Sequence, residues 1–348
     1  MFILTRDGSV TNEHGKIIYF SADRFIDDIV DGGACFICGA QPGTTEFNSE
    51  HILPNWIIRR YGLHNKQVNL PNDTGHRYAM YTIPCCKSCN DTMSAEFEKP
   101  ISEIVKQGYD ALVNYIRQEG PRKLFVWLSL IFLKAHLKDR LLPLHPDPRE
   151  GSARISDVYA WEDLHHIHCI ARSFYSGAVL DPSAYGSVFI LPAKAADPFT
   201  AFDYIDLYRA QTLLLRMDGI ALLAVLNDAC ACFNALQEMF TNISAPLSPL
   251  QLRELFARLA DANLSLETRP MFKSNIKAKE QRVIISSDHP ETMSFKQPDP
   301  GQLGTILLHS VQEVLTALGA IDDVDAISQG KWSSLYSPDG TFNNGNIE

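Results

Sequence analysis

Two Cys-x-x-Cys pairs in the first hundred residues give the strongest chemical signal in the chain. Cys35 and Cys38 form the first pair, and Cys86 and Cys89 form the second. Two thiolates separated by two residues can reach one ion. Two such pairs complete the tetrahedral sulfur set that zinc prefers, with Zn–S distances of about 2.3 Å. The spacing therefore predicts a structural Zn²⁺. Cys85 adjoins Cys86 and leaves the fourth ligand open, although the two-residue gap to Cys89 favours Cys86.

A Glu-His pair and an asparagine beside these cysteines carry side chains suited to hydrolysis. Glu50 and His51 lie between the two pairs, and Asn90 directly follows the second. An imidazole with an unperturbed pKa near 6.5 accepts protons around neutral pH, which makes His51 a candidate general base. Glu50 and Asn90 offer hard oxygen ligands for a catalytic Mg²⁺ or Mn²⁺. Neighbouring residues on a strand face opposite sides, so Glu50 and His51 serve one site only where the strand ends or bends, and Pro54 supplies such a break.

The order of these elements resembles the HNH endonuclease family, whose active site is the ββα-metal or His-Me finger motif. The resemblance covers about residues 30 to 100, where an acidic residue precedes a histidine on the first strand and a Cys-x-x-Cys-Asn begins the helix. It implies that His51 is the general base, that Glu50 and Asn90 hold the catalytic ion, and that the four cysteines hold zinc away from the chemistry. The implied reaction is metal-dependent hydrolysis of a phosphodiester in DNA, with RNA less favoured.

The chain also departs from this pattern. The segment between His51 and Cys86 is longer than in compact members of the family, and Asn69 is the nearest candidate for the family's middle asparagine. The position four after Asn90, often His or Lys in the family, is Ser94. These departures bear on activity more than on the fold. A zinc ribbon that binds nucleic acid or a protein partner without catalysis is therefore the alternative function.

The overall charge limits how the chain meets nucleic acid. The net charge is −10, so a polyanion needs a local basic groove or a bridging divalent metal. Arg59 and Arg60 are candidate phosphate contacts, although an exposed arginine pair is equally typical of ordinary surface.

The cysteine pattern and the apolar runs indicate a cytoplasmic protein. Clustered Cys-x-x-Cys pairs fit metal ligation in a reducing compartment better than a disulfide framework. The N-terminus lacks the features of a signal peptide, and the densest apolar run, residues 124–133, is too short to cross a bilayer. We therefore expect no membrane partner.

Length and patterning predict an α+β protein of two domains. Residues 1–120 would form a zinc-stabilised ββα-metal domain. Residues 121–348 would form a larger mixed domain with a regulatory, partner-binding or substrate-binding role. Because a free nuclease endangers its own cell, we expect control by a protein partner or by homo-oligomerisation. The corresponding hypothesis is an effector of defence against phage or plasmids.

The elements expected around the site follow from periodicity and end signals. Strands are expected over residues 44–52, 76–83 and 165–174, the last with His166 and His168 packed on one face rather than forming a second metal site. Helices are expected over residues 54–61, over 91–116 with a kink or split at Pro100, and over 121–142. In the second half, an Asp-Gly turn predicts a hairpin of 212–216 with 220–226, and Ser248 is the expected N-cap of a helix over 249–259.

Overall fold

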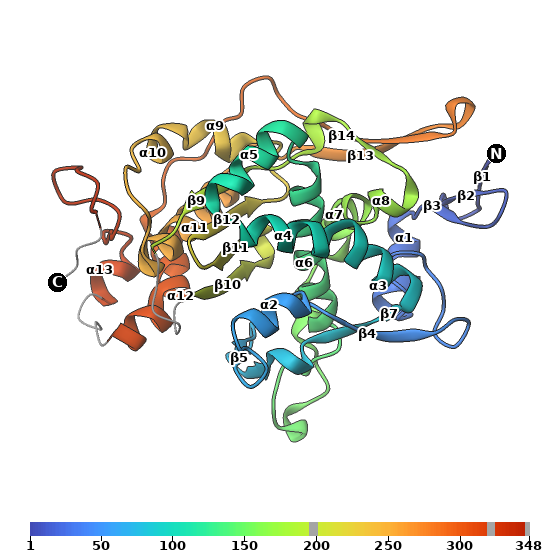
Figure 1. The fold of residues 1–348 in the computed structure, drawn as a ribbon, viewed down its shortest axis with the longest axis horizontal. Coiled ribbons are helices and arrows are strands. Elements are labelled where there is room, and N and C mark those ends of the chain that lie inside the picture. The colour runs from blue at the N-terminus through green and yellow to red at the C-terminus, as the bar shows by residue number, and fades with distance from the viewer. Residues whose placement is uncertain (195–200, 319–323, 345–348) are drawn as a thin grey trace. The chain divides into compact units, whose positions relative to one another are not determined.

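The computed structural model describes residues 1–194, 201–318 and 324–344. Its contacts divide the chain into two compact units, which are described separately (Figure 1). Unit 1 contains Met1–Glu103, Gly120–Ala184 and Phe272–Ser286, and unit 2 contains Ile104–Glu119, Tyr185–Met271 and Ser287–Glu348. The mixture of helices and antiparallel sheets confirms the expected α+β class.

Unit 1 consists of short strands and helices. Its sheets have the orders β1-β2-β3, β4-β7, β5-β6 and β13-β14-β8. The strands are β1 (Phe2–Leu4), β2 (Val10–Asn12), β3 (Ile17–Tyr19), β4 (Phe47–His51), β5 (Gln67–Asn69), β6 (Gly75–Arg77), β7 (Thr82–Cys86), β8 (Val179–Leu180), β13 (Met271–Lys277) and β14 (Arg282–Asp288). The helices are α1 (Ala22–Arg24), α2 (Asn55–Arg60), α3 (Lys87–Met93), α6 (Arg122–Asp139), α7 (His165–Ala171) and α8 (Ser173–Ser176).

The helical segment after β7 breaks at a glycine rather than at the proline. Helix α3 continues through a turn with π-type bonding (Ser94–Glu98) into α4 (Lys99–Lys106), and Pro100 occupies the first turn of α4. A proline is tolerated there because its missing N–H has no partner within the helix. Gly108, with a φ of 96°, separates α4 from α5 (Tyr109–Glu119). The helix is therefore not split at Pro100, and the split lies about two turns later, at Gly108.

Helix α6 forms the centre of unit 1. It is buried along nearly its whole length and packs on α7 and β7. Residues 165–174, expected as a strand, form α7 and α8 instead. Two polar side chains of α7, His165 and His168, donate to the backbone carbonyls of Phe20 and Phe36.

The residue ranges of the units differ from the expected division at residue 120. Helix α6 lies against β7, and the late hairpin β13-β14 returns to unit 1. Strand β14 pairs in parallel with β8, Ile284 opposite Val179, and the Phe272 ring stacks on His166 at 4.3 Å between centroids. Elements from three parts of the sequence therefore complete unit 1.

Unit 2 is a four-stranded antiparallel sheet, order β10-β11-β12-β9, covered by helix α11 (Figure 1). The expected hairpin at Asp218-Gly219 is confirmed as β11 with β12, and both strands are buried throughout. Ser248 caps α11 as predicted, in a reciprocal box with Gln251. The elements are β9 (Val188–Pro192), β10 (Phe202–Leu207), β11 (Thr212–Met217), β12 (Ile220–Val225), α9 (Ala231–Ala235), α10 (Gln237–Thr241), α11 (Pro249–Leu264), α12 (Pro300–Leu318) and α13 (Val324–Ser328).

Candidate functional site

Strands β4 and β7 with helix α3 form a compact ββα arrangement in unit 1 (Figure 1). The two strands are antiparallel, with Phe47 opposite Cys86 and His51 opposite Thr82. Strand β7 ends at Cys86, and α3 begins at the next residue. Glu50 and His51 therefore lie at the far end of β4, and Asn90 lies in the first turns of the helix.

The four cysteines of the two pairs converge on one point. The Sγ atoms of Cys35, Cys38, Cys86 and Cys89 all lie within 4.8 Å of one another. A tetrahedron with Zn–S bonds of about 2.3 Å has edges of about 3.8 Å, so the sulfurs are spaced as zinc requires. Among the described residues this is the only such group of three or more His, Cys, Asp or Glu side chains.

The chemistry of the sulfurs agrees with a cation at their centre. The neighbouring Cys35 raises the pKa of Cys38 to about 12 and also raises the pKa of Cys89. Four thiols so close together can lose all four protons only if a cation offsets the negative charges of the resulting thiolates. Cys85 is not in this set, although its Sγ lies 3.7 Å from that of Cys35. The donors thus fit a structural Zn²⁺, with Cys86 as the fourth ligand.

Side chains of α7 and of the residue that follows it bind the backbone around the first cysteine pair. Arg172, which follows the helix and is 2% exposed, donates to the carbonyl oxygens of Ile37, Ile18 and Ile17 at 3.0, 3.0 and 2.7 Å. Nε2 of His168 donates to the carbonyl oxygen of Phe36 at 2.9 Å. These carbonyls belong to the turn between the two cysteines and to β3, so the two polar side chains set the position of the turn.

Glu50 is the acceptor of a buried ion pair. Its Oε1 lies 2.5 Å from Nζ of Lys134 on α6, and the two side chains are 6% and 3% exposed. The same Nζ donates to the carbonyl oxygen of His51 at 2.7 Å. Glu98 lies near both groups: burial raises its pKa to about 7, with Lys134 lowering it and Glu50 raising it. The end of β4 is thus held by an ammonium rather than open to solvent.

The imidazole of His51 is half-buried and makes no hydrogen bond among the described residues. Burial lowers its pKa below the usual value; the Glu50 charge opposes this shift, and Lys134, His64 and Arg59 add to it. The ring is therefore neutral at pH 7, with an open nitrogen that can take a proton.

The remaining predicted residues make other contacts or lie exposed. Nδ2 of Asn90 donates to Oδ1 of Asn48 on β4 at 3.0 Å, which leaves Oδ1 of Asn90 as a free acceptor. Arg59 and Arg60 are exposed on α2, and Arg60 lies over the Tyr61 ring. Asn69 is exposed at the end of β5. No hydrogen bond of the described residues joins Glu50, His51 and Asn90 to one another.

The contacts of Glu50 and Asn90 show whether these residues can bind the expected catalytic metal ion. A divalent ion at Glu50 would have to displace the Lys134 ammonium, because that ammonium already neutralises the carboxylate. Oδ1 of Asn90 is a free hard oxygen, but no hydrogen bond of the described residues joins Asn90 to Glu50 or His51. The residues as arranged do not form the expected Mg²⁺ or Mn²⁺ site, so no catalytic step below passes through such an ion.

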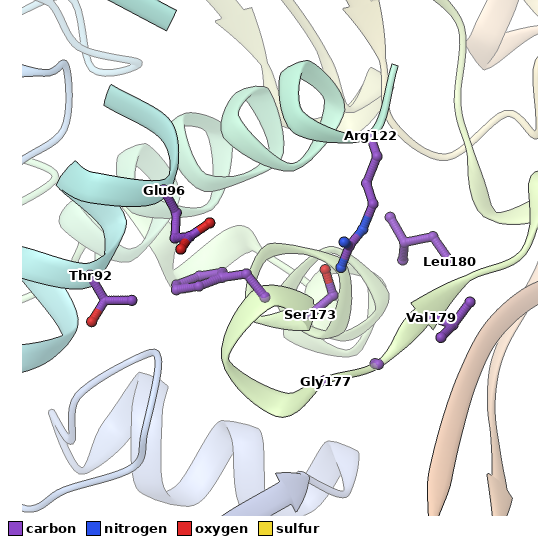
Figure 2. A pocket seen from close by; sticks show the side chains of 9 residues that line it. Thr92, Glu96, Arg122, Ser173, Gly177, Val179 and Leu180 are labelled. Atoms are coloured by element: carbon purple, nitrogen blue, oxygen red, sulfur yellow. The ribbon is translucent and has the colours of Figure 1, made fainter. Parts of the chain in front are cut away.

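A separate pocket of about 470 Å³ lies beside helix α3. Figure 2 shows the ends of Glu96 and Arg122 and the hydroxyl of Ser173 directed toward it. Thr92 also lines it, two residues beyond Asn90, which corresponds to about 200° around a helix. The pocket therefore lies on a different side of α3 from Asn90 and is lined by none of Glu50, His51 and Asn90.

Comparison with protein-family models, curated proteins and solved structures finds no match for the chain. Within the described ranges, no helix has the length and apolarity needed to span a bilayer.

Sequence reasoning missed three residues of the site. Lys134 and Arg172 lie in stretches that otherwise read as apolar core, and a lone cation there is itself a signal, because burial of an unpaired charge is costly. His64 gave no signal beyond its residue type.

Proposed function

We propose that this chain is a nuclease of the HNH type that hydrolyses phosphodiester bonds in DNA, with His51 as the general base. The observation that carries the proposal is the position of His51: a neutral imidazole with a free nitrogen at the end of β4, in a ββα arrangement whose helix begins at a four-cysteine cluster. The resemblance to the HNH pattern at Glu50-His51 and Cys86-x-x-Cys89-Asn90 supports the same reaction.

In the proposed reaction, His51 removes a proton from a water molecule as the water oxygen attacks phosphorus. A new P–O bond forms, the P–O bond to the leaving sugar oxygen breaks, and that oxygen finally takes a proton from solvent. Lys134 fixes the carbonyl of His51 and thereby the backbone that carries the imidazole. A positioned general base contributes about 10²- to 10⁴-fold to such a rate.

Local charge favours a phosphate near His51 despite the net charge of −10. Arg59 and His64 both lie close enough to lower the pKa of His51, and both are exposed. Arg60 adds a second exposed arginine on α2. Arginine contacts with phosphates position a nucleic-acid backbone without reading its sequence.

The buried Glu50–Lys134 pair favours a second candidate function. A carboxylate that is neutralised within the fold serves stability, and the zinc cluster with the exposed Arg59 and Arg60 would then be a scaffold for nucleic acid or a protein partner. In that case the chain binds without cleaving.

The test compares His51→Ala with His14→Ala, a matched change of a strongly exposed histidine between β2 and β3. Supercoiled plasmid, single-stranded DNA and RNA are incubated with each protein in Mg²⁺, Mn²⁺ or chelator, and zinc content is measured. We expect plasmid nicking by the wild type and by His14→Ala, and a loss of at least 100-fold in His51→Ala with zinc unchanged. A wild type that holds zinc and binds DNA but cleaves no substrate in any metal would establish the scaffold instead.

A further inference from the structure

The ammonium of Lys134 is bound by oxygen atoms of the kind that bind metal ions in proteins. It lies 2.5 Å from a carboxylate oxygen of Glu50 and 2.7 Å from the carbonyl oxygen of His51. Carboxylate and backbone carbonyl oxygens are the ligands that hard divalent cations take in proteins. Glu98 brings a second carboxylate close to the same ammonium.

The surroundings show that this charge has a specific partner. Lys134 is 3% exposed on α6, a helix on which eleven of the other fourteen buried side chains are apolar. Removing an ammonium from water costs several kcal/mol, which only a well-placed anion and further hydrogen bonds offset. Glu50, 5% exposed, is that anion. Removal of either group would leave the other as an unpaired buried charge, which is strongly destabilising.

We propose that Lys134 takes the place of a divalent cation at Glu50, so that this carboxylate is a ligand of a built-in ammonium and not of a metal ion. Glu50, the His51 carbonyl and the nearby Glu98 form a cation site that the chain itself fills. Removing the ammonium while keeping the carboxylates leaves uncompensated negative charge around hard oxygens, which is a site for Mn²⁺ or Mg²⁺.

This inference concerns the site of the proposed hydrolysis and deepens that proposal. Its test measures metal binding rather than cleavage, so a protein without nuclease activity still answers the question. Mn²⁺ is the probe because its paramagnetic signal reports the bound fraction directly. The zinc-loaded full chain is titrated as wild type, Glu50→Gln, Lys134→Met, and the double variant Lys134→Met/Glu50→Gln.

We expect Lys134→Met to bind Mn²⁺ at least tenfold more tightly than the wild type, and Mn²⁺ to raise its melting temperature. The double variant, which removes both charges while nearly keeping their volumes, should fold without Mn²⁺ and lose the added affinity. Glu50→Gln alone should not weaken any Mn²⁺ binding of the wild type.

Two results would overturn the proposal. One is wild-type Mn²⁺ binding that disappears with Glu50→Gln, because Glu50 would then be a metal ligand with Lys134 in place. The other is a Lys134→Met protein with no gain in Mn²⁺ affinity. If Lys134→Met does not fold alone, the proposal requires that Mn²⁺ or the second change Glu50→Gln restores folding, and failure of both contradicts it.

Discussion

Replacing Arg172 by methionine should loosen the first cysteine pair although Arg172 is not a zinc ligand. The guanidinium is buried and donates to three backbone carbonyls, of Ile17, Ile18 and Ile37. Burial lowers its pKa to about 10, so the group remains charged at neutral pH. Methionine fills a similar volume but leaves all three carbonyls without a donor.

The size of the effect follows from these three bonds. Hydrogen bonds to a charged group contribute about 1.5–3 kcal/mol each. Their loss is partly offset because a guanidinium no longer has to be buried, at a saving of several kcal/mol. We therefore expect unit 1 to lose about 2–5 kcal/mol of unfolding free energy. The Ile37 carbonyl lies between Cys35 and Cys38, so zinc should also leave faster.

The assay combines urea unfolding with release of zinc to a chromogenic chelator. Three of the four tryptophans, Trp56, Trp127 and Trp161, lie in unit 1, so fluorescence reports mainly on that unit. Arg172→Lys should fall between wild type and methionine, because one ammonium cannot reach three carbonyls. Arg149→Met, at a strongly exposed site, is the control and should match the wild type. If Arg172→Met unfolds and releases zinc as the wild type does, the three bonds do not position the cysteine turn.

Three further predictions concern other parts of the chain. Cys86→Ser should lose the bound zinc and destabilise unit 1, whereas Cys85→Ser should keep one zinc per chain by metal analysis; the opposite pattern would exchange their roles. Burial raises the pKa of Glu98 to about 7, so between pH 4.5 and 7 the folded chain binds a proton that the unfolded chain has lost, and the stability due to Glu98 falls as pH rises through this window. Glu98→Gln should remove that dependence and be about 1–3 kcal/mol more stable than the wild type at pH 8 by urea unfolding, and equal slopes with pH would contradict this reasoning. Glu254 accepts bonds from the backbone of Ser334 and Leu335 and from the hydroxyl of Ser333, so Glu254→Ala should cost unit 2 about 2–4 kcal/mol and expose the chain after Trp332 to protease; an unchanged digestion pattern would refute this anchoring role.

The local elements of the site could be predicted because their signals are local. The two-residue gaps predicted the cysteine cluster, and the hydrophobic pattern predicted strand β4 and helix α6 within a few residues. The Asp218-Gly219 turn and the Ser248 cap were recognised from single residues whose backbone or side-chain chemistry few others supply.

The partners of Glu50 could not be predicted in the same way. Lys134 lies 84 positions away in the chain, and nothing in the sequence around either residue specifies the other. The same holds for Arg172, whose three acceptors are backbone atoms and carry no residue signature. Residues 165–174 were assigned to a strand because a short stretch of mixed polarity fits either period, and only the tertiary contacts of His168 and Arg172 favour the helix.

The return of β13 and β14 to unit 1 bears on how the protein is made. The ribosome releases the cysteine pairs early, but the strand that pairs with β8 is synthesised only after residue 282. The whole sheet of unit 2 emerges in between. The unit that carries the four cysteines therefore stays incomplete until the chain beyond residue 282 has been synthesised.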